Sequence, residues 1–524
     1  MFIRERLTTA ILGLFAVTTD LHAQCESGTI LGPPVAGADF GRSVATDGDV
    51  LVVGAPGLAQ AMPYRFESGQ WVADGPPLTG AVGSRFGFAL TYVNGVLAIG
   101  APDAAAGTTA NVGTVSIYSR SGPGTWILTA TLTPTTITTN ADFGAAVDLD
   151  LGNRLVVGEP GFGSRRGRAT IFESAGSGFV SVATYHEPAL DTNAELGSAV
   201  AISGDSVCIG APNADVAGAV NRGKAVFLRR QASGAWNSVG SYWYSSLSQA
   251  CGYQVDLEGD RAVVAFRSIN RVGAVLTWNG SAFQYTSEFE FAPDYNAVVN
   301  GIPRLADGRV FLTRPKATKN LLNTLHGTLR VYDIDPFTSQ LVSPKDLWSL
   351  DELSEGFGAS LTVSSTRIAI GAPQYWKSGS GFVGRVHTYD RTVNGWNWGT
   401  IGLPSVGSGF SAIESMGKGS LCANQPVALT MFSNYPDRPA FLVLGFSQVS
   451  VPFGGYFTLY PSPDLVLTGL STNDYGSLEI SAVVPPGIPS GSVLTFQYFL
   501  DLTSPTSPIS PDLHQGIGVV GEFP

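Results

Sequence analysis

Hydrophobic and polar residues alternate over short stretches of this 524-residue chain, and tight turns separate the stretches. Arg42–Ala45 alternates, Asp47-Gly48-Asp49 carries residues that hairpin turns favour because such turns need positive φ, and Val50–Val53 is continuously apolar. The same order returns further along, for example at Asn94-Gly95 followed by Val96–Ile99. No convincing helical period accompanies it. The pattern predicts an all-β protein of many short strands.

Two short motifs, Phe-Gly and Gly-Ala-Pro, mark each return of this order. The clear copies begin at Phe40, Phe86, Phe143, Leu196 and Phe357. The second motif starts 13 residues after the first glycine in four of these copies and 14 residues after it in the other. The gap from Leu196 to Phe357 is 161 residues, about three repeat lengths, so we expect two altered copies inside it.

One altered copy is Cys251-Gly252 with Ala265-Phe266-Arg267 at the same offset. The other keeps only the proline of Thr313-Arg314-Pro315, with Asn300 standing 13 residues before Thr313. Seven units of four strands predict a seven-bladed β-propeller. In that geometry we expect the motif phenylalanine to pack between blades and the glycine to allow close backbone approach, which makes the motif structural.

The repeat resembles the FG-GAP family, which builds the propeller at the head of integrin α chains and of many secreted bacterial proteins. The resemblance covers roughly residues 25–404 and implies ligand binding through loops on one face of the propeller. Many FG-GAP blades hold calcium in an Asp-x-Asp-x-Asp-Gly loop, and calcium needs six to eight oxygen ligands. The nearest approach here, Asp148-Leu149-Asp150-Leu151-Gly152, has no acidic residue close behind it. We therefore predict no metal site and no cofactor, as in the short-turn bacterial form.

The two ends of the chain predict export and a second domain. Residues 1–23 read as a signal peptide, with Arg4 and Arg6 before an apolar run that is too short to span a bilayer. No other segment is long and apolar enough to cross a membrane, so we expect a secreted or cell-surface protein. The propeller is assigned to 24–404, a linker to 405–419, and a small β-sandwich of longer strands to 420–524.

Which strand closes the ring is open. Leu31-Gly32-Pro33-Pro34 aligns with Asp74-Gly75-Pro76-Pro77, so the N-terminal segment reads as an outer strand displaced to the front of the chain. It is a candidate to complete the seventh blade. Trp396–Ile401 competes for the same position.

Export permits disulfides among the four cysteines. Of the three possible pairings we favour Cys208–Cys251, on inner positions of neighbouring blades, together with Cys25–Cys422, which would tie the N-terminus to the C-terminal domain. The alternative is that Cys208 is simply a small buried residue.

Composition and motifs exclude several functions. Lys plus Arg number 30 against 41 Asp plus Glu, and the net charge of −11 argues against a nucleic-acid partner. The four histidines after the signal segment show no metal-ligand spacing, and no nucleophile or phosphate-loop motif is present. The candidate binding residues lie in the loops after Gly-Ala-Pro: Asp103, Arg165, Arg166, Asn213, Asp215, Tyr375, Trp376 and Lys377.

Tyr375-Trp376 is the most suggestive pair, because exposed aromatic residues often mark protein or sugar contacts. The alternative is that Trp376 folds over a blade edge. The sequence favours a non-enzymatic binding or adhesion-like protein with an extracellular protein or glycan ligand. An extracellular polysaccharide hydrolase or lyase using carboxylates such as Asp142, Glu195 and Glu355 is a second hypothesis. A structural envelope or matrix component is a third.

Overall fold

The computed structural model describes residues 26–522 apart from 176–177, 188–189, 245–248, 268–270, 291–300, 319–324, 336–337, 349–355, 392–397, 402–413, 420, 423, 425, 433–436, 454–456, 474–476, 490–491, 502–512 and 516–517. The expected signal peptide lies outside the described residues. Among the helices of the described part, none has the length and apolarity needed to cross a membrane.

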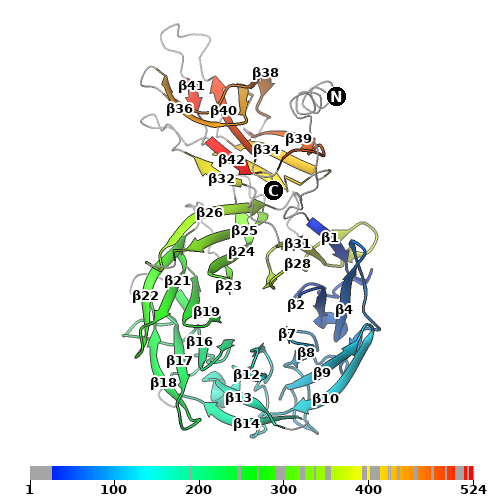
Figure 1. The fold of residues 1–524 in the computed structure, drawn as a ribbon. Coiled ribbons are helices and arrows are strands. Elements are labelled where there is room, and N and C mark those ends of the chain that lie inside the picture. Colours follow the sequence, from blue (N-terminus) through cyan, green and yellow to red (C-terminus); the bar gives the residue numbers. More distant parts are fainter. Residues whose placement is uncertain are drawn as a thin grey trace.

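Four-stranded antiparallel sheets stand around a central axis, which confirms the predicted all-β propeller (Figure 1). In the first six blades four strands follow one another in chain order from the axis outward, because tight turns join neighbouring antiparallel strands. The first three sheets are β2 (Val44–Asp47), β3 (Val50–Ala55), β4 (Gln60–Glu67) and β5 (Gln70–Ala73), with β6 (Leu78–Thr79) beside β4; β7 (Ala89–Val93), β8 (Val96–Ala101), β9 (Thr114–Gly122) and β10 (Thr125–Leu132); and β11 (Ala146–Leu149), β12 (Arg154–Glu159), β13 (Arg168–Ala175) and β14 (Gly178–Tyr185).

The next three groups of strands repeat this order. They are β15 (Ala199–Ser203), β16 (Ser206–Ala211), β17 (Lys224–Arg230) and β18 (Trp236–Tyr242); β19 (Gln249–Glu258), β20 (Arg261–Arg267), β21 (Arg271–Trp278) and β22 (Phe283–Glu290); and β23 (Ile302–Ala306), β24 (Arg309–Thr318), β25 (Leu325–Ile334) and β26 (Leu341–Trp348). Helical structure in the described ring is limited to two short turns, η1 (Pro56–Leu58) and α2 (Phe162–Arg165).

The N-terminal strand closes the ring. The last sheet takes β27 (Ser360–Val363), β28 (Arg367–Ala372) and β31 (Arg385–Asp390) from the end of the repeat region, and its outer strand is β1 (Glu26–Leu31). β1 runs antiparallel to β31, with Ile30 opposite Val386. Thr388 in β31 also donates its hydroxyl to the carbonyl oxygen of Gly28 at 2.8 Å. The competing strand, β32 (Trp398–Ile401), pairs elsewhere.

The two halves of the repeat motif meet across blade boundaries. The Gly-Ala-Pro glycine of one unit lies against the carbonyl oxygen of the Phe-Gly glycine of the next unit, so closely that any Cβ would overlap that oxygen. This contact recurs at five boundaries: Gly54 with Gly87, Gly100 with Gly144, Gly158 with Gly197, Gly210 with Gly252, and Gly371 with Gly41. The motif is therefore a joint between blades.

Within each unit the same two glycines are hydrogen-bonded. The amide of Gly87 donates to the carbonyl oxygen of Gly100 at 3.1 Å, and that of Gly144 donates to Gly158 at 3.0 Å. The motif phenylalanine packs beside this joint. Phe143, for example, is fully buried in a cluster that contains residues of both its own blade and the preceding one. A large apolar ring at each boundary buries surface that a bare glycine contact leaves open.

The predicted Cys208–Cys251 disulfide is wrong, because both cysteines are free thiols. They lie on neighbouring blades and are fully buried in one hydrophobic cluster, but the Cys251 sulfur instead faces the carbonyl oxygen of Tyr242 at 3.8 Å. Burial raises the pKa of the Cys251 thiol to about 12, so it acts as a small apolar side chain. Cys422 is also buried, and Cys25 lies outside the described residues, so Cys25–Cys422 stays a prediction.

The repeat ends in strands that join the ring to the C-terminal region. β32 pairs with β26 through Trp398 and Asp346, and on its other side with β42 (Gly518–Glu522). The sheet continues through β40 (Val493–Asp501), β35 (Pro439–Gly445) and β38 (Leu465–Ser471), and β41 (Leu513–Gln515) pairs with β40. One continuous sheet therefore runs from the propeller axis into the C-terminal region.

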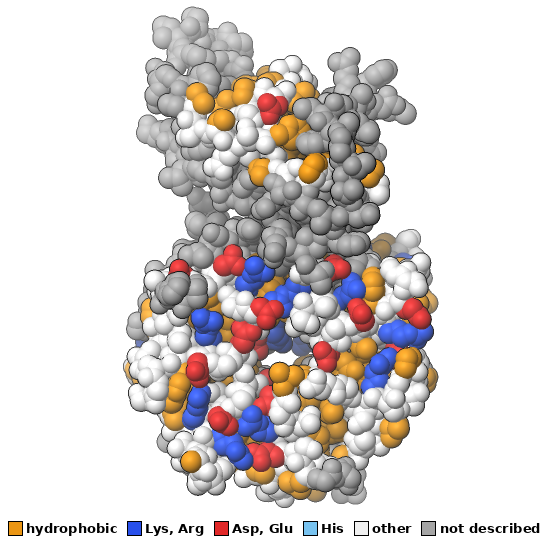
Figure 2. Space-filling view, viewed as in Figure 1, with side chains coloured by type: hydrophobic (Ala, Val, Ile, Leu, Met, Phe, Trp, Pro, Cys, Tyr) orange, Lys and Arg blue, Asp and Glu red, His pale blue; other side chains and the backbone are white. Residues whose placement is uncertain are grey.

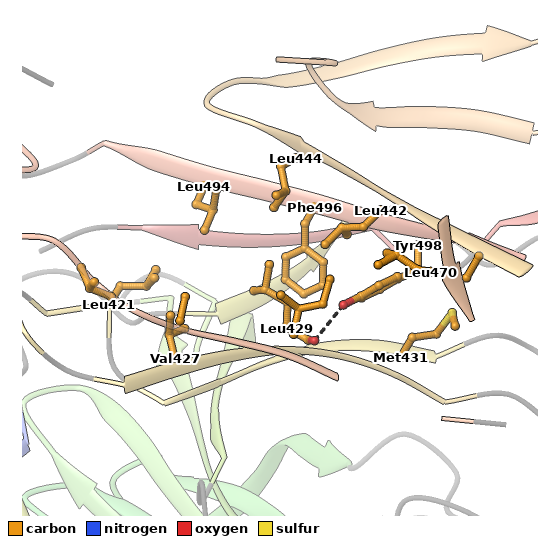
Figure 3. Close-up of a cluster of buried hydrophobic side chains, with 14 of the residues drawn as sticks. Leu421, Val427, Leu429, Met431, Leu442, Leu444, Leu470, Leu494, Phe496 and Tyr498 are labelled. Atoms are coloured by element: carbon orange, nitrogen blue, oxygen red, sulfur yellow. Dashed lines mark hydrogen bonds between the residues drawn. The ribbon is translucent and has the colours of Figure 1, made fainter. Parts of the chain in front are cut away.

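A second C-terminal sheet consists of β33 (Glu414–Gly419), β34 (Pro426–Phe432) and β39 (Ser477–Val483), and β36 (Gln448–Phe453) pairs with β37 (Phe457–Pro461). β33 occupies part of 405–419, where a linker was expected, because its backbone pairs along the full length of β34. Side chains of the two larger sheets share one core (Figure 3), where the buried Tyr498 hydroxyl donates to the carbonyl oxygen of Leu429 at 2.8 Å.

We predict that Gly100→Ala destabilises the ring by about 2 kcal/mol or more, because the added methyl group overlaps the Gly144 carbonyl oxygen. Gly122→Ala is the matched control, since a Cβ at Gly122 meets no atom within 4 Å. Guanidinium unfolding of both variants measures the difference. Equal stability of the two variants would contradict the proposed joint.

Thiol titration tests the cysteine assignments. The native protein, purified from an exporting host, should show no reactive thiol because Cys208 and Cys251 are buried, and two thiols after unfolding without reductant. All four should react after reduction. No thiol in the unfolded, unreduced chain would mean that Cys208 and Cys251 are joined. Four at that stage would rule out Cys25–Cys422.

Candidate ligand-binding site at the propeller axis

The loops after Gly-Ala-Pro and those before Phe-Gly lie side by side on one face of the ring, as the family resemblance implies. The amide of Asp103 donates to the carbonyl oxygen of Ser84 at 3.1 Å, and the amide of Asn213 donates to Ala194 at 3.3 Å. We call this side the loop face. It brings the candidate binding residues onto the same end of the propeller, although they come from four different blades.

Three of the candidate charged side chains are already engaged by neighbours. Asp103 accepts two hydrogen bonds from the Arg85 guanidinium, at 2.5 and 2.6 Å. Arg165 forms an ion pair with Glu195 of the following unit. Arg166 donates to the carbonyl oxygen of Leu190 at 2.9 Å. These interactions hold the loops in place, so the three charged groups are less available for hydrogen bonds to a ligand.

Asn213 and Asp215 have different positions. Asn213 lines the central cavity described below. Asp215 is exposed, and its carboxylate accepts the amide of Asn221 at 2.8 Å, which closes the tip of its own loop. Asn213 is therefore placed to contact a ligand at the axis, whereas Asp215 fixes a loop.

Of the aromatic pair, Tyr375 is covered by an arginine, whereas Trp376 is exposed. The Arg385 guanidinium lies 4.2 Å from the centre of the Tyr375 ring. Trp376 is 51% exposed and stands opposite Phe382, which is 56% exposed, in the small hairpin of β29 (Trp376–Lys377) and β30 (Gly381–Phe382). Lys377 is exposed beside them. Trp376 thus projects from the rim of the loop face instead of folding over a blade edge.

A cavity of about 380 Å³ opens at the axis, and Figure 2 shows an opening at the centre of the ring with side chains of both charges around it. Its rim is formed by the residue that follows Phe-Gly in successive units, which we call the mouth ring: Arg42, Phe88, Ala145, Ser198, Tyr253 and Ala359. Sequence reasoning missed these residues because it looked only at loops. The signal was present, since each stands one position after a motif glycine.

A second hollow of about 660 Å³ leads from the mouth ring toward the aromatic hairpin. The two hollows share Arg42 and Phe88, and the second also contains Gln374 and Phe382. The Phe88 ring lies between two guanidinium groups, 4.9 Å from Arg42 and 4.5 Å from Arg85. Cation–π contacts of this kind hold the side chains of two blades in fixed positions. The loop face therefore has a continuous depression from its axis to its rim.

The family model for the FG-GAP repeat matches residues 34–63, which contain the first Phe-Gly and Gly-Ala-Pro pair and Gly54, one side of the first glycine joint. The chain carries an FG-GAP repeat. No curated protein matches the chain significantly.

Two solved structures resemble this protein at low identity. A protein from Lactobacillus plantarum is 13% identical with a TM-score of 0.39, covering 57% of this chain and 82% of its own. A streptogramin B lyase is 8% identical with a TM-score of 0.44, covering 70% of this chain and 100% of its own. At these scores neither likeness bears on activity.

Deeper in the channel, a second ring of equivalent positions ties the blades of the propeller together. It contains Thr91, Asp148, Asp256, Arg304 and Thr362, and we call it the waist ring. Four of its members accept an amide hydrogen bond from the next blade: Thr91 from Leu149 at 3.2 Å, Asp148 from Ile202 at 2.8 Å, Asp256 from Leu305 at 2.6 Å, and Thr362 from Thr46 at 3.3 Å.

Two carboxylates of the waist ring titrate abnormally. Burial in the channel raises the pKa of Asp148 to about 7, and the negative charge of Asp256 raises it further against the opposing Ile202 amide and Arg304. Burial also raises the pKa of Asp256. Because both accept hydrogen bonds from the backbone of the next blade, their first role is to join blades.

The carboxylates considered for hydrolysis do not form a matched pair. Burial raises the pKa of Asp142, and the charges of Asp103 and Glu195 add to this effect while Arg165 and Arg85 oppose it. Glu195 is held by Arg165, and Glu355 lies outside the described residues. Within the described part of the chain, no three His, Cys, Asp or Glu side chains are grouped as metal ligands.

We predict that Asp148→Asn removes part of the pH dependence of folding. A carboxyl whose pKa is raised from 3.8 to about 7 in the folded state loses its proton at a higher pH than in the unfolded chain, so stability falls as pH rises between these two values and changes no further above about 7. Asparagine does not titrate and keeps an oxygen for the Ile202 amide. At pH 8 the variant should be more stable by on the order of 1 kcal/mol.

Thr91→Val is the control, because it removes an interblade acceptor of the same ring without removing a charge. It should lower the free energy of unfolding at every pH and leave the slope unchanged. If urea unfolding from pH 4 to pH 9 gives Asp148→Asn the wild-type slope, Asp148 is not the group responsible.

Proposed function

We propose that this FG-GAP propeller is an exported, non-enzymatic binding protein that holds an extracellular protein or glycan ligand in the depression on its loop face. The observation that carries the proposal is the mouth ring. In each unit the mouth-ring residue stands between the Phe-Gly glycine and the Gly-Ala-Pro glycine in sequence, and these glycines repeat almost without change. The mouth-ring residues themselves vary: they are Arg42, Phe88, Ala145, Ser198, Tyr253 and Ala359. Equivalent backbone positions thus present five different kinds of side chain around one hollow.

The surroundings of the mouth ring support binding. Binding sites are commonly concave, with aromatic side chains and a few fixed polar groups. Here Phe88 and Tyr253 supply the aromatic rings, and Asn213 and Gln254 supply amides. The loops that carry them are braced by the Arg85–Asp103 and Arg165–Glu195 ion pairs. A site held in this way loses little conformational entropy when a ligand binds.

One observation favours a second candidate, a polysaccharide hydrolase or lyase. A general acid must keep its proton near the working pH, and burial raises the pKa of Asp142 on the loop face. If the protein depolymerises a polysaccharide, Asp142→Asn should abolish the reaction while ligand binding survives. Depolymerisation that persists in the variant would show that Asp142 is not the general acid.

The binding proposal is tested by filling the hollow. On glycan and protein arrays the exported chain should bind a defined ligand, and Ser198→Trp should reduce that binding at least ten-fold because an indole would occupy the cavity. Ser181→Trp is the matched control, since Ser181 is an exposed position on the outer strand β14. Thermal melting checks the fold of both variants.

Absence of binding to every array component would contradict the proposal and favour a structural role. Equal binding by the two tryptophan variants would place the ligand elsewhere on the protein.

A further inference from the structure

The central cavity contains three arginines whose guanidinium groups donate no hydrogen bond to a carboxylate among the described residues. They are Arg42 and Arg267 near the mouth and Arg304 at the waist. Other arginines on the loop face are paired, as Arg85 is with Asp103 and Arg165 with Glu195. The cavity therefore differs in charge from the surface that surrounds it.

Arg267 comes from the altered motif of the fifth unit. It stands where the other clear copies have the proline of Gly-Ala-Pro, so a structural residue is replaced by a cation at the axis. Its guanidinium lies 4.1 Å from the centre of the Tyr253 ring, which belongs to the mouth ring. Its Nε is buried and has no hydrogen-bond partner in the part of the chain that the structure describes. A buried donor without a partner destabilises the folded protein, and a bound acceptor would remove that cost.

Arg42 and Arg304 face the same cavity from other blades. The nearest carboxylate to Arg42 is Asp39, whose oxygen lies 3.9 Å from Nε, beyond hydrogen-bond distance. Arg304 donates only to the carbonyl oxygen of its neighbour Pro303, at 3.1 Å, within the described structure. Arg304 also lines the hollow below the waist, so it marks the floor of the mouth cavity.

The lining of the cavity is thus mainly positive, with the charge of Arg304 offset by the waist carboxylates Asp148 and Asp256, although the chain carries a net charge of −11. The one carboxylate in its lining, Glu195, is bound to Arg165. A positive hollow in an acidic protein selects for an anionic group, because guanidinium–carboxylate hydrogen bonds are among the strongest in proteins.

We propose that the cavity binds a carboxylate-bearing sugar unit of an acidic polysaccharide, an inference that rests on the binding function proposed above. A uronate ring fits a hollow of about 380 Å³ better than an aspartate or glutamate side chain, whose thin stem would leave most of that volume unfilled. Asn213, Ser198 and Gln254 supply hydrogen-bonding groups for hydroxyls around the ring. The adjoining hollow, which ends at Phe382, takes the next sugar units.

The test compares one sugar with and without its charge. Calorimetric titrations of the exported chain use galacturonic, glucuronic and mannuronic acid oligosaccharides, their methyl esters, neutral oligosaccharides of equal length, and oligoglutamate. We expect at least one uronate to bind, its methyl ester to bind at least ten-fold more weakly, and affinity to fall with added salt. Arg267→Gln and Arg42→Gln should each weaken uronate binding roughly ten-fold or more.

Arg309→Gln is the matched control, because Arg309 is paired with Asp333 at 2.7 Å and lines neither hollow. Its affinity should equal that of the wild type, and melting curves check that all three variants fold. A tightly bound neutral sugar or protein with no uronate binding would overturn the inference and leave the binding function standing. Preference for oligoglutamate would assign an acidic peptide instead. Failure of every array component and every oligosaccharide would overturn both.

Discussion

The backbone contact between glycines of adjacent blades sets the spacing on which the rest of the ring depends. At five boundaries the Gly-Ala-Pro glycine of one blade touches the carbonyl oxygen of the Phe-Gly glycine of the next, and no side chain fits between them. This contact fixes the distance between neighbouring inner strands. The interblade hydrogen bonds of the waist ring, such as Asp148 with the Ile202 amide, form only because the strands are that close. The axial cavity is a consequence of the same spacing.

A scaffold fixed by backbone contacts leaves nearby side chains free to vary. The residue after each Phe-Gly projects into the cavity, where arginine, aromatic, serine and alanine side chains stand at equivalent positions. In the fifth unit the motif itself is altered, and Arg267 stands in place of proline. Loss of the motif in one unit is tolerated by the fold, and it places a positive charge at the centre of the loop face.

Much of this architecture could be predicted from the sequence, because the repeat shows directly which residues are equivalent. The propeller and the loop face both follow from the spacing of Phe-Gly and Gly-Ala-Pro. The Cys208–Cys251 pairing failed because neighbouring blades bring two side chains near one another without fixing the direction of their sulfur atoms. The pairing of β32 with β42 joins positions more than a hundred residues apart, and no local pattern indicates it.

The candidate site was predicted only in part, for a related reason. Charged loop residues such as Asp103 and Arg165 look free in a sequence, but their partners Arg85 and Glu195 come from other segments of the chain. Asn213 lines the axial cavity and Trp376 is exposed, and the binding role of both side chains stays a prediction. The mouth-ring residues stand one position after the motif glycine, outside the motif itself, so the motif alone does not indicate them.

A crystal structure of the protein with a bound uronate oligosaccharide tests the central claim most directly. The account predicts one sugar ring inside the mouth ring, with its carboxylate within hydrogen-bond distance of Arg267 or Arg42 and further sugar units directed toward Phe382. A saccharide bound only on the outer strands or the C-terminal sheets, with the axial cavity filled by solvent, would contradict it.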